Sequence, residues 1–371
     1  MFRKMFQRVN LFASSRLFQL GVRESATPEC TISPQTAADS DYEHRLNEEI
    51  EHYRSVENVT DLPPICYFWL DKYVRPKLRE VFGVSDVVEF YAKYIVQFRA
   101  VHPDQTIEIA SLGAGNADIE VGIAKVLVEK GITDFRFLCL DINTDMLQRG
   151  RELTSQQQLS DHFKFLQVDL AHWRPEHPLA IVMAQHILHH TVKLEETFSN
   201  IKEAIGANGY FLTADMVGRN GHMRWLEALE IVQGIWKIMP DRYKFNHQLK
   251  HFEEIYENWD CSKEGFEGIR AQDILPLLVR NFHFEGFVAF GNLHDIFMDR
   301  GFGPNFDVEN PEDMEFIDRI GALNDRLISD GAIKPTQIVA AMRCQPTGQM
   351  RCYQHWTPEF CIRRVEEPAG W

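Results

Sequence analysis

Two glycines and a row of carboxylates and histidines are the residues whose types and spacing suggest chemistry. The segment IEIASLGAGNADIE, residues 107–120, places Gly113 and Gly115 between an apolar run and a stretch with helical periodicity. Glycine lets the backbone turn sharply and approach a ligand closely, and a following helix directs its free N–H groups at the same point. This pattern predicts a nucleotide-binding loop.

The next three apolar runs each lead into polar residues. FLCLDI contains Asp141, FLQVDL ends near Asp169, and AIVMAQHI is followed by His189 and His190. An acid at the carboxyl end of a strand can accept hydrogen bonds from both hydroxyls of a ribose. Because open α/β sheets bind ligands along the edge where successive strands end, we expect these side chains to lie near the glycine loop.

One acidic residue helps to decide between a dinucleotide and a nucleoside ligand without phosphates. A dinucleotide fingerprint has Gly or Ala three residues after its second glycine, where the helix leaves room for a pyrophosphate. This sequence has Asp118 at that position and Glu120 in the same turn. Their negative charges oppose a pyrophosphate, which favours a ligand without phosphates over NAD.

Short β-rich runs predict an α/β fold. Five of them occur within residues 107–217 with helical stretches between most of them: IEIASL, FRFLCLDI, FKFLQVDL, AIVMAQHI and GYFLTADMV. Strands that alternate with helices predict a parallel sheet covered by helices on both faces. Two further strand-like runs, FHFEGFVAFGN and PTQIVAAM, come after a long helical stretch.

This order of features resembles the class I methyltransferases that use S-adenosylmethionine, over residues 104–343. The resemblance implies a Rossmann-like, doubly wound, mostly parallel sheet of seven strands, with PTQIVAAM as its antiparallel last strand. It also implies S-adenosylmethionine as the cofactor and methyl transfer by in-line displacement as the reaction. The sequence departs from the family at Ser111, where the family often has an acid, and at Ala117, where it often has a third glycine.

The same resemblance assigns nine residues to the cofactor. In the family the glycine loop supports the methionine part, and the acid after the second strand holds the ribose. The acid after the third strand contacts the adenine, and the end of the fourth strand lines the pocket. The residues at these places are Gly113, Ala114 and Gly115, then Asp141 with Ile142, then Asp169 with Leu170, and finally Gln185 with His186.

Methyl transfer does not always require a catalytic side chain, because the reaction depends mainly on the orientation of donor and acceptor. A base is required only if the acceptor loses a proton, and the candidates are His186, His189 and His190. The LHH stretch is common in this family across unrelated substrates, which favours a packing or capping role for these histidines.

Substrate contacts are expected in a helical cap inserted after the fifth strand, at about residues 218–278. A cap over the open edge of the sheet would exclude water and shape the acceptor pocket. The candidates are Asp215, His222, Trp225, Tyr243 and His247. His247 and His251 would share one face of a helix, but an HxxxH pair without a third ligand is frequent on amphipathic helices, so no metal site is predicted.

The domain organisation follows from these patterns. We expect a flexible leader over residues 1–40, a helical region over 41–103, the methyltransferase domain over 104–343 and a tail over 344–371. The first 23 residues contain five Lys or Arg and no acid, which is the composition of an organelle-targeting peptide or a surface helix.

Composition restricts the function classes. The net charge of −15 argues against nucleic acid as the main partner, and no apolar run is long enough to span a membrane. Seven cysteines without CxxC pairs suggest a reducing compartment, and we expect a cytoplasmic protein. The predicted partner is a small or medium-sized acceptor, and no particular oligomeric state is indicated. A nicotinamide-dependent oxidoreductase and a non-catalytic binding module on the same fold are the alternatives.

Overall fold

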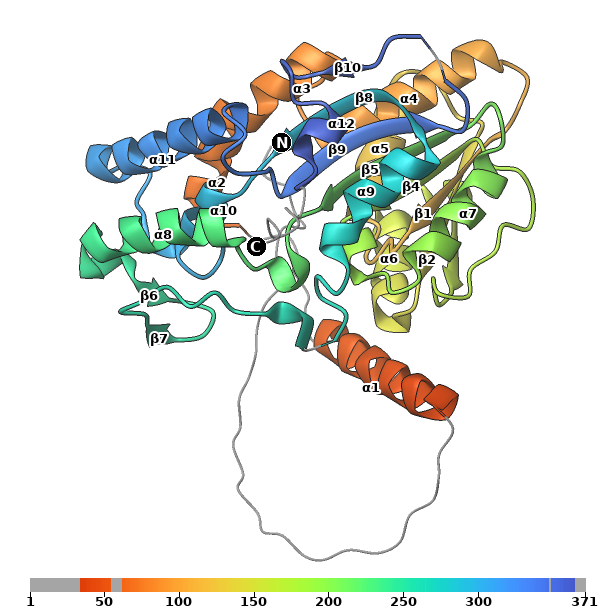
Figure 1. Ribbon diagram of the computed structural model, residues 1–371. Helices are drawn as coiled ribbons and strands as arrows, with labels where there is room; N and C mark the ends of the chain where they lie inside the picture. Colours follow the sequence, from red (N-terminus) through yellow and green to blue (C-terminus); the bar gives the residue numbers. More distant parts are fainter. Residues whose placement is uncertain (1–33, 55–61, 264, 347, 364–371) are drawn as a thin grey trace, which may run out of the picture.

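The computed structural model describes residues 34–54, 62–263, 265–346 and 348–363, which form an α/β fold around one large sheet (Figure 1). The sheet has eight strands in the order β10-β8-β9-β5-β4-β1-β2-β3. Their bounds are β1 (Ile107–Leu112), β2 (Phe135–Asp141), β3 (Phe163–Gln167), β4 (Ile181–Gln185), β5 (Tyr210–Met216), β8 (His283–Phe290), β9 (Gln337–Arg343) and β10 (Arg351–Cys352).

The Rossmann-like architecture predicted from the strand pattern is confirmed. Strands β1 to β5 are parallel to one another, whereas β9 runs antiparallel to both β5 and β8. The run PTQIVAAM therefore contains all of the antiparallel strand except Arg343. The predicted number of seven strands is wrong by one, because β10 pairs with β8 at the sheet edge. The segment predicted as a tail thus contributes β10 and the short helix α12 (Pro358–Cys361).

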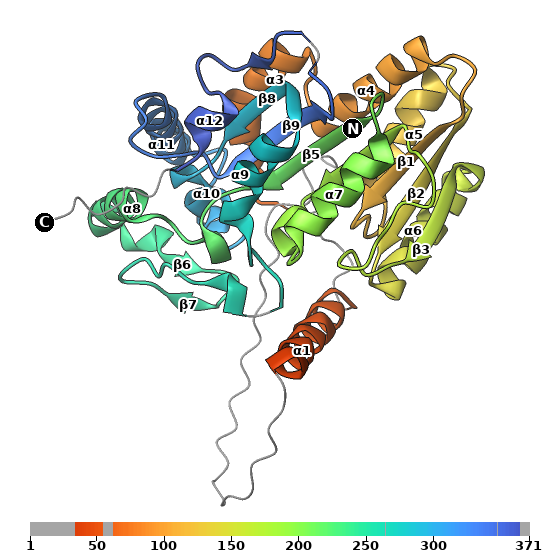
Figure 2. The same cartoon turned by 45° about the vertical axis from the view of Figure 1, so that its right-hand side comes forward.

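Helices cover both faces of the sheet (Figure 2). One face carries α4 (Val87–Val101), α5 (Asp118–Glu129) and α6 (Thr144–Gln156), and the other carries α7 (Leu194–Ile205) and α9 (Ala271–Asn281). Side-chain caps start two of them: Asp86 accepts a hydrogen bond from the Glu89 amide, and Asn143 accepts from the amides of Asp145 and Met146. Between these layers every residue of β4 and β5 is buried.

The helical N-terminal region comprises α1 (Pro34–Arg54), α2 (Pro64–Trp69), a π-helical turn η2 (Leu70–Val74) and α3 (Arg75–Phe82), followed by α4. In both views α1 lies below the body of the fold (Figures 1 and 2). It begins at Pro34, so the predicted leader ends earlier than residue 40, and the rest of that leader lies outside the described residues.

The segment between β5 and α9 forms a cap of mixed structure. It contains η5 (Asn220–His222), α8 (Leu226–Ile238), η6 (Asp241–Tyr243), the hairpin strands β6 (Phe245–Asn246) and β7 (His251–Phe252), and η7 (Cys261–Lys263). The predicted all-helical cap is therefore wrong around the hairpin, where His247 and His251 do not share a helix face. The predicted boundary at 278 is also late, because α9 from Ala271 covers the sheet.

A second insertion lies between β8 and β9 and packs against the cap. It consists of α10 (Leu293–Met298), η8 (Gly303–Asn305) and α11 (Pro311–Ser329). Trp236 of α8 meets Phe302 edge-on at a centroid distance of 4.9 Å, and Tyr243 stacks on Phe306 at 4.6 Å. Trp236 and Tyr243 of the cap are thus buried against aromatic side chains of the second insertion.

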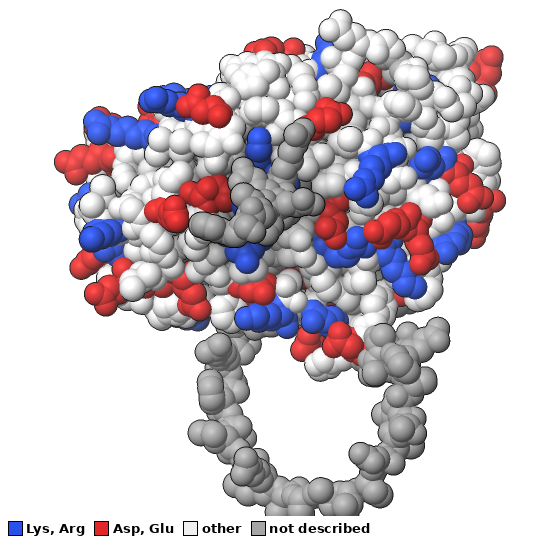
Figure 3. Space-filling model, viewed as in Figure 1, with Lys and Arg blue, Asp and Glu red and all other residues white. Residues whose placement is uncertain are grey.

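The surface carries charged side chains of both signs. Lys and Arg side chains are interspersed with Asp and Glu over the face shown in Figure 3. No helix within the described part of the chain combines the length and apolar character needed to cross a membrane.

Candidate functional site

The glycine loop follows β1 and lies against the loop after β4. Gly113 and Gly115 have φ values of 63° and 54°, which glycine adopts far more easily than other residues. A Cβ on Gly113 would lie 2.3 Å from Cγ1 of Ile187, so the two loops are in direct contact. Ala114 is fully buried and its amide donates to the carbonyl of Leu140, which anchors the loop to β2.

Asp141 at the end of β2 ties this loop to the next one. Its Oδ2 accepts a hydrogen bond from the Gly115 amide at 2.7 Å, and its Oδ1 accepts from the Asn143 amide at 2.9 Å. Asn143 in turn caps α6. A carboxylate oxygen accepts more than one hydrogen bond, so these contacts position Asp141 without preventing it from receiving ligand hydroxyls.

A carboxylate also lies beside Ser111, where the related family often has an acid. The Ser111 hydroxyl donates to Oε1 of Glu120 at 2.5 Å, and both residues are buried beneath the loop. Glu120 comes from the first turn of α5, which begins after Ala117 in the left-handed conformation (φ 58°). The carboxyl group of Glu120 thus lies next to the position at which the sequence lacks an acid.

Two adjoining pockets form one cleft along the carboxyl edge of the sheet. They share Gly113, Asp141, Ile142, Ile187 and His190, together with Glu49 of α1. The first encloses about 700 Å³ of space without atoms, open solvent at its mouth included, and the second about 520 Å³. The first also contains Gly115, Asn143, Met146, His186, His189 and Glu267, and the second contains Asp169, Leu170, Thr191, Val192 and Phe266.

Helix α1 lies along this cleft and makes hydrogen bonds or an ion pair with three other segments of the chain. The Tyr42 hydroxyl donates to Oδ1 of Asp169 at 2.8 Å, and Glu49 pairs with Nδ1 of His190 at 2.7 Å. Arg45 donates to the carbonyls of Ser262 and Gly265, both at 2.9 Å. Burial and the neighbouring Asp169 raise the pKa of Tyr42, so its phenol stays protonated as a donor.

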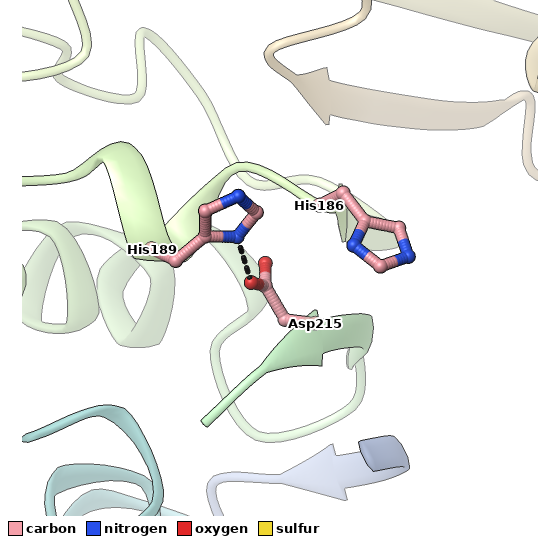
Figure 4. A group of neighbouring side chains, drawn as sticks. All are labelled: His186, His189 and Asp215. Atoms are coloured by element: carbon pink, nitrogen blue, oxygen red, sulfur yellow. Dashed lines mark hydrogen bonds and ion pairs between the residues drawn. The ribbon is translucent and has the colours of Figure 1, made fainter. Parts of the chain in front are cut away.

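Asp215 at the end of β5 organises the turn that follows β4. Its Oδ2 accepts from the amides of Ile187 and Leu188 at 2.9 and 2.8 Å, and its Oδ1 pairs with Nδ1 of His189 at 2.6 Å. Figure 4 shows His189 bonded to this carboxylate and the His186 ring on its other side. Burial lowers the pKa of His189, but the carboxylates of Asp215 and Glu267 outweigh burial and raise it to about 10. His189 is therefore an imidazolium at neutral pH.

Glu267, in the loop before α9, gathers three imidazoles. Its carboxylate lies 2.6 Å from Nε2 of His222, 3.2 Å from Nε2 of His190 and 3.5 Å from Nε2 of His189. These ion pairs outweigh burial and hold the pKa of Glu267 well below its usual range. Burial lowers the pKa of both remaining imidazoles. At His190 the carboxylates of Glu49 and Glu267 outweigh burial, so the pKa is raised, whereas at His222 burial prevails and the pKa is lowered.

The cluster also separates the cleft from a cavity inside the cap. His189, His190 and Glu267 line the cleft, whereas His222 lines the cap cavity. That cavity is further lined by Met216, Arg224, Asn246, Gln248, Leu249, Glu253, Tyr256, Glu257, Trp259, Cys261, Ile296, Asp299 and Phe302. His222 and Glu267 therefore form part of the wall between the two hollows.

Most residues assigned to the cofactor line the cleft, namely Gly113, Gly115, Asp141, Ile142, Asp169, Leu170 and His186. Ala114 and Gln185 lie buried beside it, and Oε1 of Gln185 accepts from the Tyr91 hydroxyl at 3.0 Å. The placement of Gln185 on the pocket wall is therefore wrong. Ile187, two residues later, occupies that place.

The predicted substrate residues divide into two groups. Asp215 and His222 join the histidine cluster. Trp225 instead lies between the guanidinium groups of Arg219 and Arg363, Tyr243 is in the aromatic core of the cap, and His247 is exposed and bonded to Asn305. The expectation of pocket contacts is wrong for these three, because the hairpin and the second insertion turn this part of the cap away from the cleft.

Sequence reasoning missed the residues that reach the cleft from distant segments. Glu49 and Tyr53 come from α1, and Glu267 comes from the end of the cap. Neither segment carries a recognisable motif. The glycines at 265 and 268 are the single local signal near Glu267, since both have positive φ and mark a shaped loop.

This chain is similar to a known protein family and to a curated protein. Residues 104–263 match the model of a family described as methyltransferase domain. A curated relative is the polyketide synthase-nonribosomal peptide synthetase phmA of Phaeosphaeria nodorum (strain SN15 / ATCC MYA-4574 / FGSC 10173). It is 24% identical over 194 residues, which are 51% of this chain. The match spans about 4% of the length of that relative.

Two solved structures are among those that match this chain. A putative sarcosine dimethylglycine methyltransferase from Galdieria sulphuraria is 14% identical, with 83% of this chain and 98% of that chain covered and a TM-score of 0.43. The DszA carbon methyltransferase is 20% identical, with 35% of each chain covered and a TM-score of 0.31.

Proposed function

Because residues 104–263 are a class I S-adenosylmethionine-dependent methyltransferase domain, we propose that the chain transfers a methyl group to a small or medium-sized acceptor held in the cleft. One observation carries the proposal: the glycine loop, Asp141 and the histidine cluster all open onto the same pocket. This arrangement supports donor binding at one end and acceptor binding at the other.

The residues present fit S-adenosylmethionine. The Gly113 backbone lies at the pocket surface without a Cβ, and the Asp141 carboxylate is held at the strand end where ribose hydroxyls would bind. Ile142 and Ile187 provide apolar walls on the way to Asp169.

When bound, S-adenosylmethionine supplies an electrophilic methyl group. The chain's own contribution is to orient the acceptor and exclude water, for which α1 and the cap are placed on two sides of the cleft. Neighbouring carboxylates outweigh burial, raise the pKa of His189 to about 10 and also raise the pKa of His190, which disfavours both residues as bases. For an acceptor that loses a proton, His186 is then the base candidate among the three histidines named from the sequence.

Calorimetric titration tests the proposal with S-adenosylmethionine, S-adenosylhomocysteine and NAD as separate ligands. Asp141→Ala removes charge-assisted hydrogen bonds worth about 1.5 to 3 kcal/mol, so the first two ligands should bind on the order of 10- to 100-fold more weakly. Asp145→Ala is the matched control, because Asp145 lies four residues later, pairs with Arg54 and does not line the cleft.

The outcomes separate the alternatives. Binding of both sulfur ligands, weakened in Asp141→Ala alone, supports the proposal and leads to an acceptor screen that follows S-adenosylhomocysteine formation. Preferential binding of NAD would replace it with an oxidoreductase. Weak or absent binding of all three ligands, without methyl transfer to any acceptor, would favour the non-catalytic binding module.

A further inference from the structure

We propose that His189, His222 and Glu267 form a binding site for a divalent transition-metal ion in the wall between the cleft and the cap cavity. The site goes beyond methyl transfer and does not depend on it. A carboxylate with two imidazoles is a ligand set that binds Zn²⁺ or Fe²⁺ in proteins.

The ligand atoms already lie close together. One ring nitrogen of His189, one ring nitrogen of His222 and a carboxylate oxygen of Glu267 all lie within 4.8 Å of one another. Metal bonds of about 2.1 Å at tetrahedral angles place neighbouring ligand atoms roughly 3.4 Å apart. The His189–Glu267 distance of 3.5 Å matches this value, and the His222–Glu267 distance of 2.6 Å requires an outward shift of less than 1 Å.

The surrounding residues hold the ligands in the orientation that metal binding needs. Asp215 bonds Nδ1 of His189 at 2.6 Å, which leaves Nε2 directed at Glu267. Carboxylate partners of this kind commonly orient metal-binding histidines. His190 bonds the second oxygen of Glu267 at 3.2 Å, so that carboxylate is also fixed.

The loops that carry the ligands are joined to each other. The Gly221 amide donates to the carbonyl of Gly268 at 2.9 Å, which links the residue before His222 to the residue after Glu267. A Cβ on Gly268 would lie 3.1 Å from Nε2 of His222. The backbone therefore brings the two ligands together at close range.

Three protein ligands leave coordination positions open. Catalytic metal sites share this feature, whereas structural zinc sites are closed by four protein ligands. Since Glu267 and His189 line the cleft and His222 lines the cap cavity, a small molecule in either hollow lies near the proposed ion.

Zn²⁺ and Co²⁺ titrations of the full chain, stripped with a chelator, test the site. We expect one Zn²⁺ per chain by calorimetry and visible absorption bands with Co²⁺. His222→Gln and Glu267→Gln should each weaken Zn²⁺ binding by more than about 100-fold, and Asp215→Asn by about 10- to 100-fold.

A matched control and an independent readout keep this test decisive. His177→Gln alters another His–Glu pair, with Glu108 at 2.5 Å, and should leave Zn²⁺ binding unchanged. Circular dichroism and S-adenosylmethionine titration report whether each variant folds, so failure of the metal site and failure of the cofactor site are distinguishable. Equal Zn²⁺ affinity in His222→Gln, Glu267→Gln and the original chain, or no Zn²⁺ binding by the folded chain, would overturn the proposal.

Discussion

Gly113→Ala is the most informative single change in the loop. The substitution adds one methyl group at a position with φ 63°, where a non-glycine residue costs roughly 1 to 2 kcal/mol. The new Cβ would also lie 2.3 Å from Cγ1 and 2.5 Å from Cδ1 of Ile187. Overpacking of this kind adds about 1 to 3 kcal/mol, so we expect a total loss of about 2 to 5 kcal/mol.

Gly83→Ala provides the matched control. Gly83 has φ 70°, but a Cβ there meets no atom within 4 Å. Gly83→Ala therefore introduces the backbone strain of a positive φ without a steric clash of the new Cβ. Urea unfolding of the two variants should show Gly113→Ala to be less stable than Gly83→Ala by about 1 to 3 kcal/mol.

A second substitution tests the cause of the difference. Ile187→Ala removes both of the closest atoms and leaves Cβ of residue 187 at 2.9 Å. Gly113→Ala should also weaken S-adenosylmethionine binding, because Ile187 lines both pockets and would be pushed into them. In the Gly113→Ala background, Ile187→Ala should restore part of that affinity. Equal unfolding free energies for Gly113→Ala and Gly83→Ala would refute the close contact between the two loops.

Two further predictions concern groups outside the cleft. Burial raises the pKa of Asp86 to about 6, so its contribution to the unfolding free energy is greatest below the unfolded pKa near 3.8 and is lost as pH rises toward 6. Asp86→Asn, which keeps a capping oxygen, should be more stable than the original chain by roughly 1 to 3 kcal/mol at pH 7, and urea unfolding from pH 4 to 8 would contradict this if both proteins changed in parallel. Asp325→Asn should destabilise the protein by roughly 3 kcal/mol because it leaves the buried Lys77 ammonium, now 2.5 Å from Asp325, without its ion pair. Glu315→Gln breaks an exposed pair and should change the same unfolding free energy by less than about 1 kcal/mol, so equal effects of the two variants would show that burial of Lys77 does not matter.

The fold was predictable from the sequence because its strands carry strong local signals. IEIASL coincides with β1, and the other apolar runs contain the remaining long strands. The two-residue strands β6, β7 and β10 are too short to leave a pattern of alternation. The hairpin was therefore mistaken for helix, and the strand in the C-terminal segment was missed.

The site was predictable where it depends on strand ends and not where it depends on long-range contacts. Asp141, Asp169 and His186 follow strands, and their positions at the sheet edge result from the topology. Glu267 and Glu49 meet His190 from segments more than 200 residues apart. The aromatic content of the cap pointed to substrate contacts, but burial in an aromatic core explains Tyr243.

The position of β9 constrains how this chain folds during synthesis. β9 lies between β5 and β8, yet it follows β5 by more than 100 residues, with α11 immediately before it. Until residues 337–343 leave the ribosome, β5 and β8 each have an unpaired edge on the side that β9 will occupy. Exposed strand edges promote aggregation, so the nascent chain depends on its own helical insertions, or on chaperones, from the synthesis of β5 until the synthesis of β9.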